Sequence, residues 1–352
     1  MNKNAEMLKR LTTPGGVSGF ESPAAQAAAR EFKPLADTVQ HDRNGSVVAT
    51  KFATSRKRGK KAPLLLIDAH VDEIGLIVTR IEDDGMLRIA QIGGFDQRVL
   101  PSQEVIVHAR RPLRGIIGSK PVHLLTPEER AAVDKLEDLY VDVGLPASSV
   151  RRLVQVGDYM SMAPWFHELR NGFYAGKAMD DRTGVAAQIL MLEALKGRQH
   201  TWDVACVAAT QEEYGGYGAS TCAFRLAPDA AIALDVTQGQ APGLSEDETF
   251  PMGKGPCIAV GPNIHPGIYD RLCKAAKAEE LPYSIEPVPG VTGTDAGPIQ
   301  VTRHGVPTGL VSIPLRYMHT SVETVAMLDI ERTGRLLARF VVDMEGPEKL
   351  RE

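Results

Sequence analysis

The sequence has 352 residues, 43% of them hydrophobic and 24% charged, and a formal net charge of -4. This composition is typical of a soluble globular protein with one large α/β domain or two domains. It offers no basic footprint for nucleic acid and no apolar run long enough to span a membrane, so we expect neither as a partner.

The N-terminal part of the chain contains both predicted helices and predicted strands. Apolar spacing predicts helices over residues 4–11 and 22–32, and strands over 47–52 and 62–70. The second strand is apolar without alternation, which is typical of a strand buried on both faces. The basic run SRKRGKK (55–61) between the strands is expected to form a solvated turn.

The N-terminal segment and the cysteines show no sign of secretion, disulfide bonds or metal binding by thiolates. The N-terminus lacks the continuous apolar segment of a signal peptide, so we expect the protein in the cytoplasm. The four cysteines form no C-x-x-C pair and have apolar or helical neighbours. They are therefore expected to be reduced packing residues, not disulfides or metal ligands.

The pattern changes at Ile74 and changes back near residue 168. Between these points, short β-rich pieces with glycine turns are interrupted by one predicted helix over 127–137. The later part predicts, in order, a helix over 180–197, strands over 203–210, 230–237 and 309–314, and a helix over 328–344. The simplest organisation is an α/β domain built from residues 1–72 and 169–352, with a small β-rich domain inserted at 73–168.

Acidic residues and histidines cluster where these strands end or where a helix begins. They are His70 and Asp72 after the strand at 62–70, Asp180 and Asp181 at a helix start, Glu212 and Glu213 after the strand at 203–210, Asp235 at the end of the strand at 230–237, and His319 after the strand at 309–314. Open α/β sheets bind ligands outside the carboxyl ends of their strands, so these side chains can converge on one site. Taken singly, each has an ordinary structural interpretation, such as a helix cap for the aspartates and solvation for the glutamates.

Taken together, these side chains predict a dinuclear metal site. Two histidines and several carboxylates, without thiolates, suit a pair of divalent ions such as Zn²⁺, Co²⁺ or Mn²⁺. One carboxylate must bridge the two ions if they are to share a water molecule.

Six motifs along the chain carry a family resemblance. They are H-x-D-E-I-G (70–75), K-A-x-D-D-R-x-G (177–184), Q-E-E-x-G (211–215), L-D-V (234–236), G-T-D-A (293–296) and R-Y-x-H (316–319). In order and spacing they resemble the dinuclear-metal aminopeptidases, a family that includes glutamyl aminopeptidase, deblocking aminopeptidase and the tetrahedral aminopeptidases. The resemblance covers essentially the whole chain. It implies a three-layer αβα metallopeptidase domain with an inserted barrel-like domain used for dimerisation or oligomerisation.

The resemblance also implies a ligand set for two divalent metal ions. Asp180 would bridge the ions, Glu213 and His319 would complete one site, and His70 and Asp235 would complete the other. Zn²⁺ is the first expectation for the metal, with Co²⁺ or Mn²⁺ as alternatives.

Three acidic residues are left for other roles. The resemblance makes Glu212 the general base and Asp72 the carboxylate that orients His70, and leaves Asp181 to cap the helix or support the site. Three carboxylate ligands and a bridging hydroxide would neutralise two divalent ions, which leaves Glu212 free to accept a proton. Side chains of an extended segment point alternately to opposite sides, so Glu212 and Glu213 are expected to serve different partners.

The function implied by the resemblance is removal of the N-terminal residue from peptides with a free N-terminus, by a hydroxide bridged between the two ions. A homo-oligomer, from a dimer up to a dodecamer, is also implied. The preferred first residue stays open, as do the roles of Arg316, His123 and His265.

Two alternatives are weighed against this function. Members of the family have been labelled endoglucanases, and paired carboxylates also cleave glycosides. A glycosidase, however, does not need two histidines grouped with further acids. The second alternative, an inactive metal-binding scaffold, does not need an unligated base such as Glu212.

Overall fold

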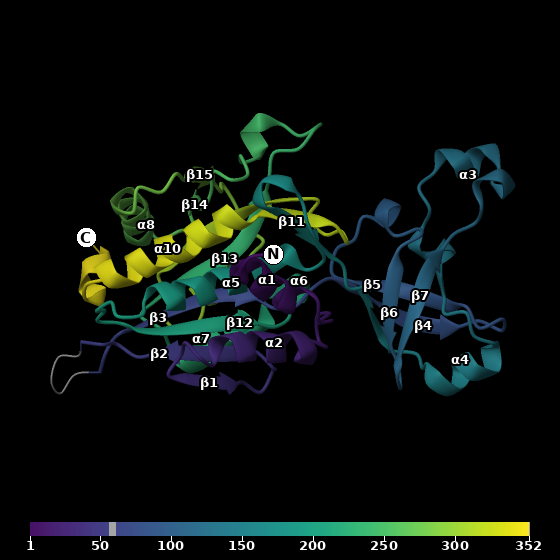
Figure 1. Cartoon of the computed structure of the whole chain (residues 1–352), viewed down its shortest axis with the longest axis horizontal. Coiled ribbons are helices and arrows are strands. Elements are labelled where there is room, and N and C mark those ends of the chain that lie inside the picture. Colours follow the sequence, from purple (N-terminus) through teal and green to yellow (C-terminus); the bar gives the residue numbers. More distant parts are fainter. Residues whose placement is uncertain (56–60, 352) are drawn as a thin grey trace.

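Figure 1 shows the protein as a computed structural model, which describes residues 1–55 and 61–351. A large sheet covered by helices lies beside a closed barrel. The predicted α/β fold with an inserted barrel-like domain is confirmed. Residues 56–60 of the basic run lie outside the described residues, so the turn predicted there stays a prediction. No described helix is both long and apolar enough to cross a membrane.

The large sheet has 11 strands within the described part of the chain. In order across the sheet they are β1 (Thr38–His41), β2 (Val47–Lys51), β12 (Asp203–Ala209), β3 (Leu64–His70), β13 (Ala230–Gln238), β16 (Thr308–Arg316), β17 (Glu323–Ala326), β11 (Phe173–Gly176) and β10 (Phe166–Glu168), while β14 (Cys257–Val260) pairs with β16 and with β15 (Ser284–Pro287). The central strands β12, β3, β13 and β16 are parallel. Their carboxyl ends therefore lie along one edge of the sheet.

The strand β3 shows why this sheet is buried on both faces. Leu65 and Ile67 belong to one hydrophobic cluster and Leu66 to another, because successive side chains of a strand point to opposite faces. The apolar run without alternation predicted this environment, and each face is covered by helices.

Helices form a layer on each face of the sheet (Figure 1). One layer contains α1 (Lys3–Thr12), α2 (Ser22–Phe32), α5 (Met179–Ala194), α8 (Pro266–Ala278) and α10 (Met327–Asp343). The other contains α7 (Tyr217–Leu226) and α9 (Ala296–Gln300). The result is the three-layer αβα arrangement implied by the resemblance.

The barrel is closed and has its own hydrophobic core. Around it the strands are β4 (Gly75–Ile81), β5 (Leu87–Ile92), β8 (Tyr140–Asp142), β7 (Pro112–Gly118), β6 (Glu104–His108) and β9 (Tyr159–Met162). The helix α4 (Ala147–Leu153), which the sequence analysis did not predict, contributes the buried side chain of Val150.

The helix predicted over 127–137 is much shorter in the structure. The helix α3 covers Pro127–Ala131, and a separate 3₁₀ turn follows at Leu136–Asp138. Neither element contains a buried residue. Because a short helix in a protein depends on packing one apolar face, this segment has nothing to extend it beyond its capped first turn.

The chain returns from the barrel to the large sheet slightly earlier than the sequence indicated. The strand β10 (Phe166–Glu168) pairs with β11 of the large sheet, although the inserted domain was expected to extend to residue 168. We propose that the inserted domain begins at about residue 73, as expected, and ends before Phe166.

Candidate metal centre

The five predicted metal ligands come from segments that meet at the carboxyl edge of the central strands. His70 is the last residue of β3, and Asp235 lies in β13, which pairs with β3. Asp180 lies in the first turn of α5, Glu213 lies in the short helix α6 (Glu212–Gly215) after β12, and His319 lies between β16 and β17. The parallel strands thus bring together residues that are far apart in the sequence.

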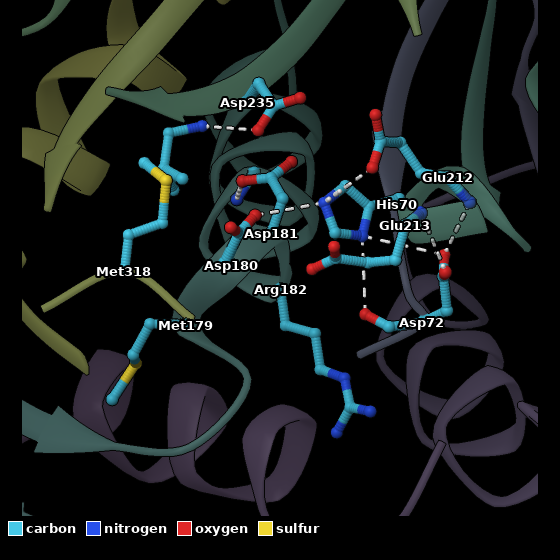
Figure 2. Close-up of polar contacts among 12 residues, drawn as sticks. His70, Asp72, Met179, Asp180, Asp181, Arg182, Glu212, Glu213, Asp235 and Met318 are labelled. Atoms are coloured by element: carbon cyan, nitrogen blue, oxygen red, sulfur yellow. Dashed lines mark hydrogen bonds and ion pairs between the residues drawn. The ribbon is translucent and has the colours of Figure 1, made fainter. Parts of the chain in front are cut away.

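The ligand atoms of these side chains form two groups that share Asp180. One group is His70, Asp180 and Asp235, the other is Asp180, Glu213 and His319, and the ligand atoms of each group lie within 4.8 Å of one another. His70 Nε2 lies 3.0 Å from Asp180 Oδ1 (Figure 2). His319 Nε2 lies 3.4 Å from Asp180 Oδ2. Each carboxylate oxygen of Asp180 thus faces a different histidine, which is the arrangement expected of a ligand that bridges two ions.

The negative charges of these side chains suit the binding of metal cations. Burial and the nearby Asp180 raise the pKa of both Glu213 and Asp235 well above the usual carboxyl range. For Asp180 burial acts in the same direction, but hydrogen bonds with His319 and His70 outweigh it and hold the pKa of Asp180 below its usual value. Buried carboxylates this close to one another resist ionisation, and nearby cations remove that resistance. The nitrogen and oxygen donors therefore fit two borderline divalent ions.

Glu212 and Glu213 lie in a helical turn, so the prediction of an extended segment is wrong. Gln211 has a φ of 60°, and the chain enters α6 directly after it. The N–H groups of Glu212 and Glu213 donate to the two carboxylate oxygens of Asp72, at 3.1 and 3.2 Å. Free N–H groups at a helix start favour a nearby anion, so the buried Asp72 stabilises this turn. The two side chains still diverge, because successive residues of a helix are about 100° apart around its axis.

The Glu212 side chain belongs to neither ligand group. Its Oε2 lies 4.0 Å from His70 Nε2. Burial raises the pKa of Glu212 to about 8; the charge of His70 opposes this shift, and the charges of Asp295, Asp72 and Asp180 add to it. Glu212 is thus a carboxylate beside His70 and outside both ligand groups, and its role as general base stays a prediction.

Asp72 contacts His70 on the side of the ring away from Asp180 (Figure 2). His70 Nδ1 lies 3.3 Å from the main-chain oxygen of Asp72 and 3.6 Å from its Oδ1. Ser18 Oγ donates to Asp72 Oδ2 at 2.6 Å. The main-chain carbonyl thus approaches the imidazole more closely than the carboxylate does, and the carboxylate also holds the segment that carries Glu212 and Glu213.

Asp181 has the contacts of a helix cap. Its Oδ1 accepts hydrogen bonds from the N–H of Gly184 at 3.0 Å and from Thr183 Oγ1 at 3.3 Å. Asp181 is absent from both ligand groups, in keeping with the capping role expected for it.

Glu73, Lys177 and Arg182 form a buried ion cluster that the sequence did not predict, although all three residues belong to the motifs. Lys177 Nζ lies 2.8 Å from both carboxylate oxygens of Glu73, and the Arg182 guanidinium lies 3.2 Å from Glu73 Oε1. Burial lowers the pKa of Lys177 to about 8, although Glu73 acts against this shift. The signal was available, since both cations flank the two aspartates in K-A-x-D-D-R-x-G.

A second missed pair is Asp68 and Asp295, which are fully buried near Glu212. Burial raises the pKa of Asp68 to about 7, and burial together with the nearby charge of Asp68 raises the pKa of Asp295 well above its usual value. Within the part of the chain that the structure describes, the carboxylate oxygens of both side chains are buried without a hydrogen-bond partner. Asp295 belongs to the G-T-D-A motif, but nothing in the sequence pairs it with Asp68.

The three residues whose roles stayed open lie outside both ligand groups. Arg316 Nε donates to the main-chain oxygen of Gln240, and its guanidinium lies 5.9 Å from the centre of the Phe173 ring. His123 is exposed in the inserted domain, and His265 directly precedes α8. Arg316 thus contacts the main chain and an aromatic ring of the protein itself.

A three-layer fold with histidines and carboxylates gathered at the carboxyl edge of its sheet fits a metal-dependent hydrolase. The chain belongs to the M42 glutamyl aminopeptidase family, whose sequence profile matches residues 45–336. It is 34% identical to the lysyl aminopeptidase of Pyrococcus furiosus over 346 residues, which are 97% of each chain. An aminopeptidase from the archaeon Desulfurococcus kamchatkensis has a TM-score of 0.89 and 35% identity, covering 99% of this chain and 97% of that one. The family resemblance inferred from the six motifs is thereby confirmed. The enzymes of this family are aminopeptidases, which are hydrolases.

Two further solved structures bear on the remaining predictions. A TET1 peptidase of Pyrococcus horikoshii, described as assembling into a tetrahedron or a large octahedral shell, has a TM-score of 0.83 and 28% identity, covering 97% of this chain and 100% of that one. A Thermotoga maritima protein called an endoglucanase has a TM-score of 0.76 and 30% identity, covering 95% of this chain and 96% of that one.

Proposed function

We propose that this protein is a dinuclear metal-dependent aminopeptidase that removes the N-terminal residue from peptides. The observation that carries the proposal is the pair of ligand groups sharing Asp180. One ion would be held by His70, Asp180 and Asp235, and the other by Asp180, Glu213 and His319. Zn²⁺ is the first ion to test, followed by Co²⁺ and Mn²⁺, since imidazole and carboxylate ligands accept all three. Two divalent ions would lower the pKa of a shared water molecule and polarise the peptide carbonyl.

The residues around the ions would then move protons and hold geometry. Glu212 would take a proton from the attacking water and return it to the leaving amine, and its position beside His70 and outside both ligand groups supports this role. Asp72 would keep this base in position, because it accepts the N–H of Glu212 and contacts His70. The free α-amine of the substrate would bind close to the cluster, which restricts cleavage to the first residue.

The proposal includes a homo-oligomer formed in part through the inserted barrel domain. Its support is the assembly described for the P. horikoshii relative and the apolar side chains that the barrel exposes. These exposed side chains are Ile116, Val122, Leu124, Val133 and Val156. The cytoplasmic location expected from the sequence stays a prediction.

The glycosidase alternative has the name of the T. maritima relative in its favour. Against it stand the two ligand groups, because a glycosidase needs two carboxyl groups flanking a bond and gains nothing from two histidines that contact a shared carboxylate. The scaffold alternative leaves the unligated Glu212 without a purpose.

An activity panel distinguishes these functions. The wild-type protein is assayed on chromogenic aminoacyl substrates with acidic, aliphatic and basic first residues, with N-acetylated copies as matched controls and a β-glucan in parallel. The panel is repeated after chelation and after return of Zn²⁺, Co²⁺ or Mn²⁺. We expect cleavage of the free-amine substrates only, its loss on chelation and its return with metal. Release of sugar without cleavage of any aminoacyl substrate would overturn the proposal.

A further inference from the structure

We infer that Glu323 is a positioning residue that holds the ligands Asp180 and His319 in place through their main-chain N–H groups. The inference rests on the proposed function, because it assumes that these two side chains bind metal. Glu323 belongs to neither ligand group, and its side chain is buried, with the residue only 2% exposed.

The register of the large sheet brings Glu323 to this position. It is the first residue of β17, and it pairs with Gly176, the last residue of β11. The chain continues from Gly176 through Lys177 to Asp180, while His319 lies four residues before Glu323. The Glu323 side chain therefore starts from a point between the two segments that carry the ligands.

Each carboxylate oxygen of Glu323 accepts hydrogen bonds from a different segment. Oε2 accepts the N–H of Met179 at 2.7 Å and that of Asp180 at 3.1 Å. Oε1 accepts the N–H of His319 at 3.0 Å. One carboxylate thus joins the start of α5 to the loop between β16 and β17, at the two residues whose side chains face each other across 3.4 Å.

The backbone around these contacts needs such support. Ala178, Tyr317 and His319 all have positive φ values, of 55°, 62° and 59°. Non-glycine residues adopt this left-handed conformation at a cost, and they keep it when surrounding contacts fix it. Glu323 bonds to His319 itself and to Met179, the residue after Ala178.

Asp72 and Glu323 therefore make similar contacts, because each joins two segments that carry proposed site residues. Asp72 joins the segment of His70 to that of Glu212 and Glu213, and Glu323 joins the segment of Asp180 to that of His319. Groups that orient metal ligands commonly affect metal affinity by about 10- to 100-fold when they are replaced.

The variant Glu323→Gln tests the inference, with Asp329→Asn as a matched control. A glutamine keeps one accepting oxygen and presents an N–H₂ group in place of the other, so a backbone N–H loses its acceptor. Asp329 is also a buried carboxylate that accepts two backbone N–H groups, from Gly253 at 2.6 Å and Gly255 at 2.9 Å, but it contacts no proposed ligand segment. Both substitutions should lower thermal stability.

The deciding measurement is the Zn²⁺ binding isotherm of each full-length protein after removal of metal. We expect at least one Zn²⁺ binding step of Glu323→Gln to weaken by about 10- to 100-fold, and both steps of Asp329→Asn to match the wild type. Unchanged binding in Glu323→Gln, or equal weakening in Asp329→Asn, would overturn the inference. Because no peptide is used, the inference can fail while the aminopeptidase proposal stands. A wild-type protein that bound no Zn²⁺ would remove the basis of both.

A measurement on the wild type covers the case in which Glu323→Gln does not fold. Hydrogen exchange of the metal-free protein, resolved by mass spectrometry, reports on the peptides that contain residues 178–181 and 318–320. We expect slow exchange at Met179, Asp180 and His319, since their N–H groups are bonded to a buried carboxylate. Exchange at the rate of a solvated loop would show that Glu323 does not hold these segments.

Discussion

The two adjacent glutamates after β12 differ in what surrounds their carboxylates. Glu213 lies with Asp180 and His319, whereas Glu212 lies outside both ligand groups and beside His70. Both residues lie in the single turn of helix α6, and the carboxylate of Asp72 fixes that turn by accepting their N–H groups. Two adjacent residues of the same type can therefore have different roles, because their backbone conformation is fixed.

We expect the substitution Glu212→Gln to keep both metal ions and to lower kcat by about 10² to 10⁴, the range of a lost acid–base step. Glu213→Gln, with the same change one residue later, is expected to lose metal, because it removes a ligand. Metal content by mass spectrometry and initial rates on one aminoacyl substrate test both variants. If Glu212→Gln loses a metal ion while Glu213→Gln keeps two, the roles of the glutamates are exchanged.

At the scale of elements, the ion cluster of Glu73, Lys177 and Arg182 connects three parts of the fold. Glu73 joins β3 to the barrel, the two cations belong to the segment that carries Asp180, and the N–H of Gly16 donates to Glu73 Oε1 at 2.8 Å. Arg182 also donates to main-chain oxygens after α1 and at Val71. All three charged side chains are buried. Removing a partner from such a cluster leaves a buried charge less well compensated, which lowers the free energy of unfolding.

Glu73→Gln is expected to lower the free energy of unfolding by about 3 to 5 kcal/mol, because two buried cations lose their counter-ion. Lys177→Met is expected to cost less, because Glu73 keeps Arg182 at 3.2 Å and the Gly16 N–H at 2.8 Å. Urea unfolding of the two variants beside the wild type measures the difference. Equal destabilisation by both substitutions would show that the glutamate is not the centre of the cluster.

At the scale of the whole molecule, local patterns predict the parts of the structure that local physics determines. The uninterrupted apolar run of β3 indicates a strand buried on both faces, and the parallel strand ends predict where His70, Glu213 and Asp235 meet. Patterns within one segment do not reveal contacts between distant segments. The helical turn of α6 depends on Asp72, 140 residues away from Glu212 along the chain, and the electrostatic effect of Asp68 on Asp295 depends on the completed fold. The exposed segment of α3 is an opposite case, in which a helical pattern has no surface to pack against.

A titration of metal into the chelated protein tests the central claim most directly. Zn²⁺ is added stepwise to the metal-free wild type, and bound metal per subunit and aminopeptidase rate are measured on the same samples. The two ligand groups sharing Asp180 predict that the rate rises as the second ion binds and is complete at two ions per subunit. A full rate at one ion per subunit, or in the metal-free protein, would contradict the dinuclear mechanism.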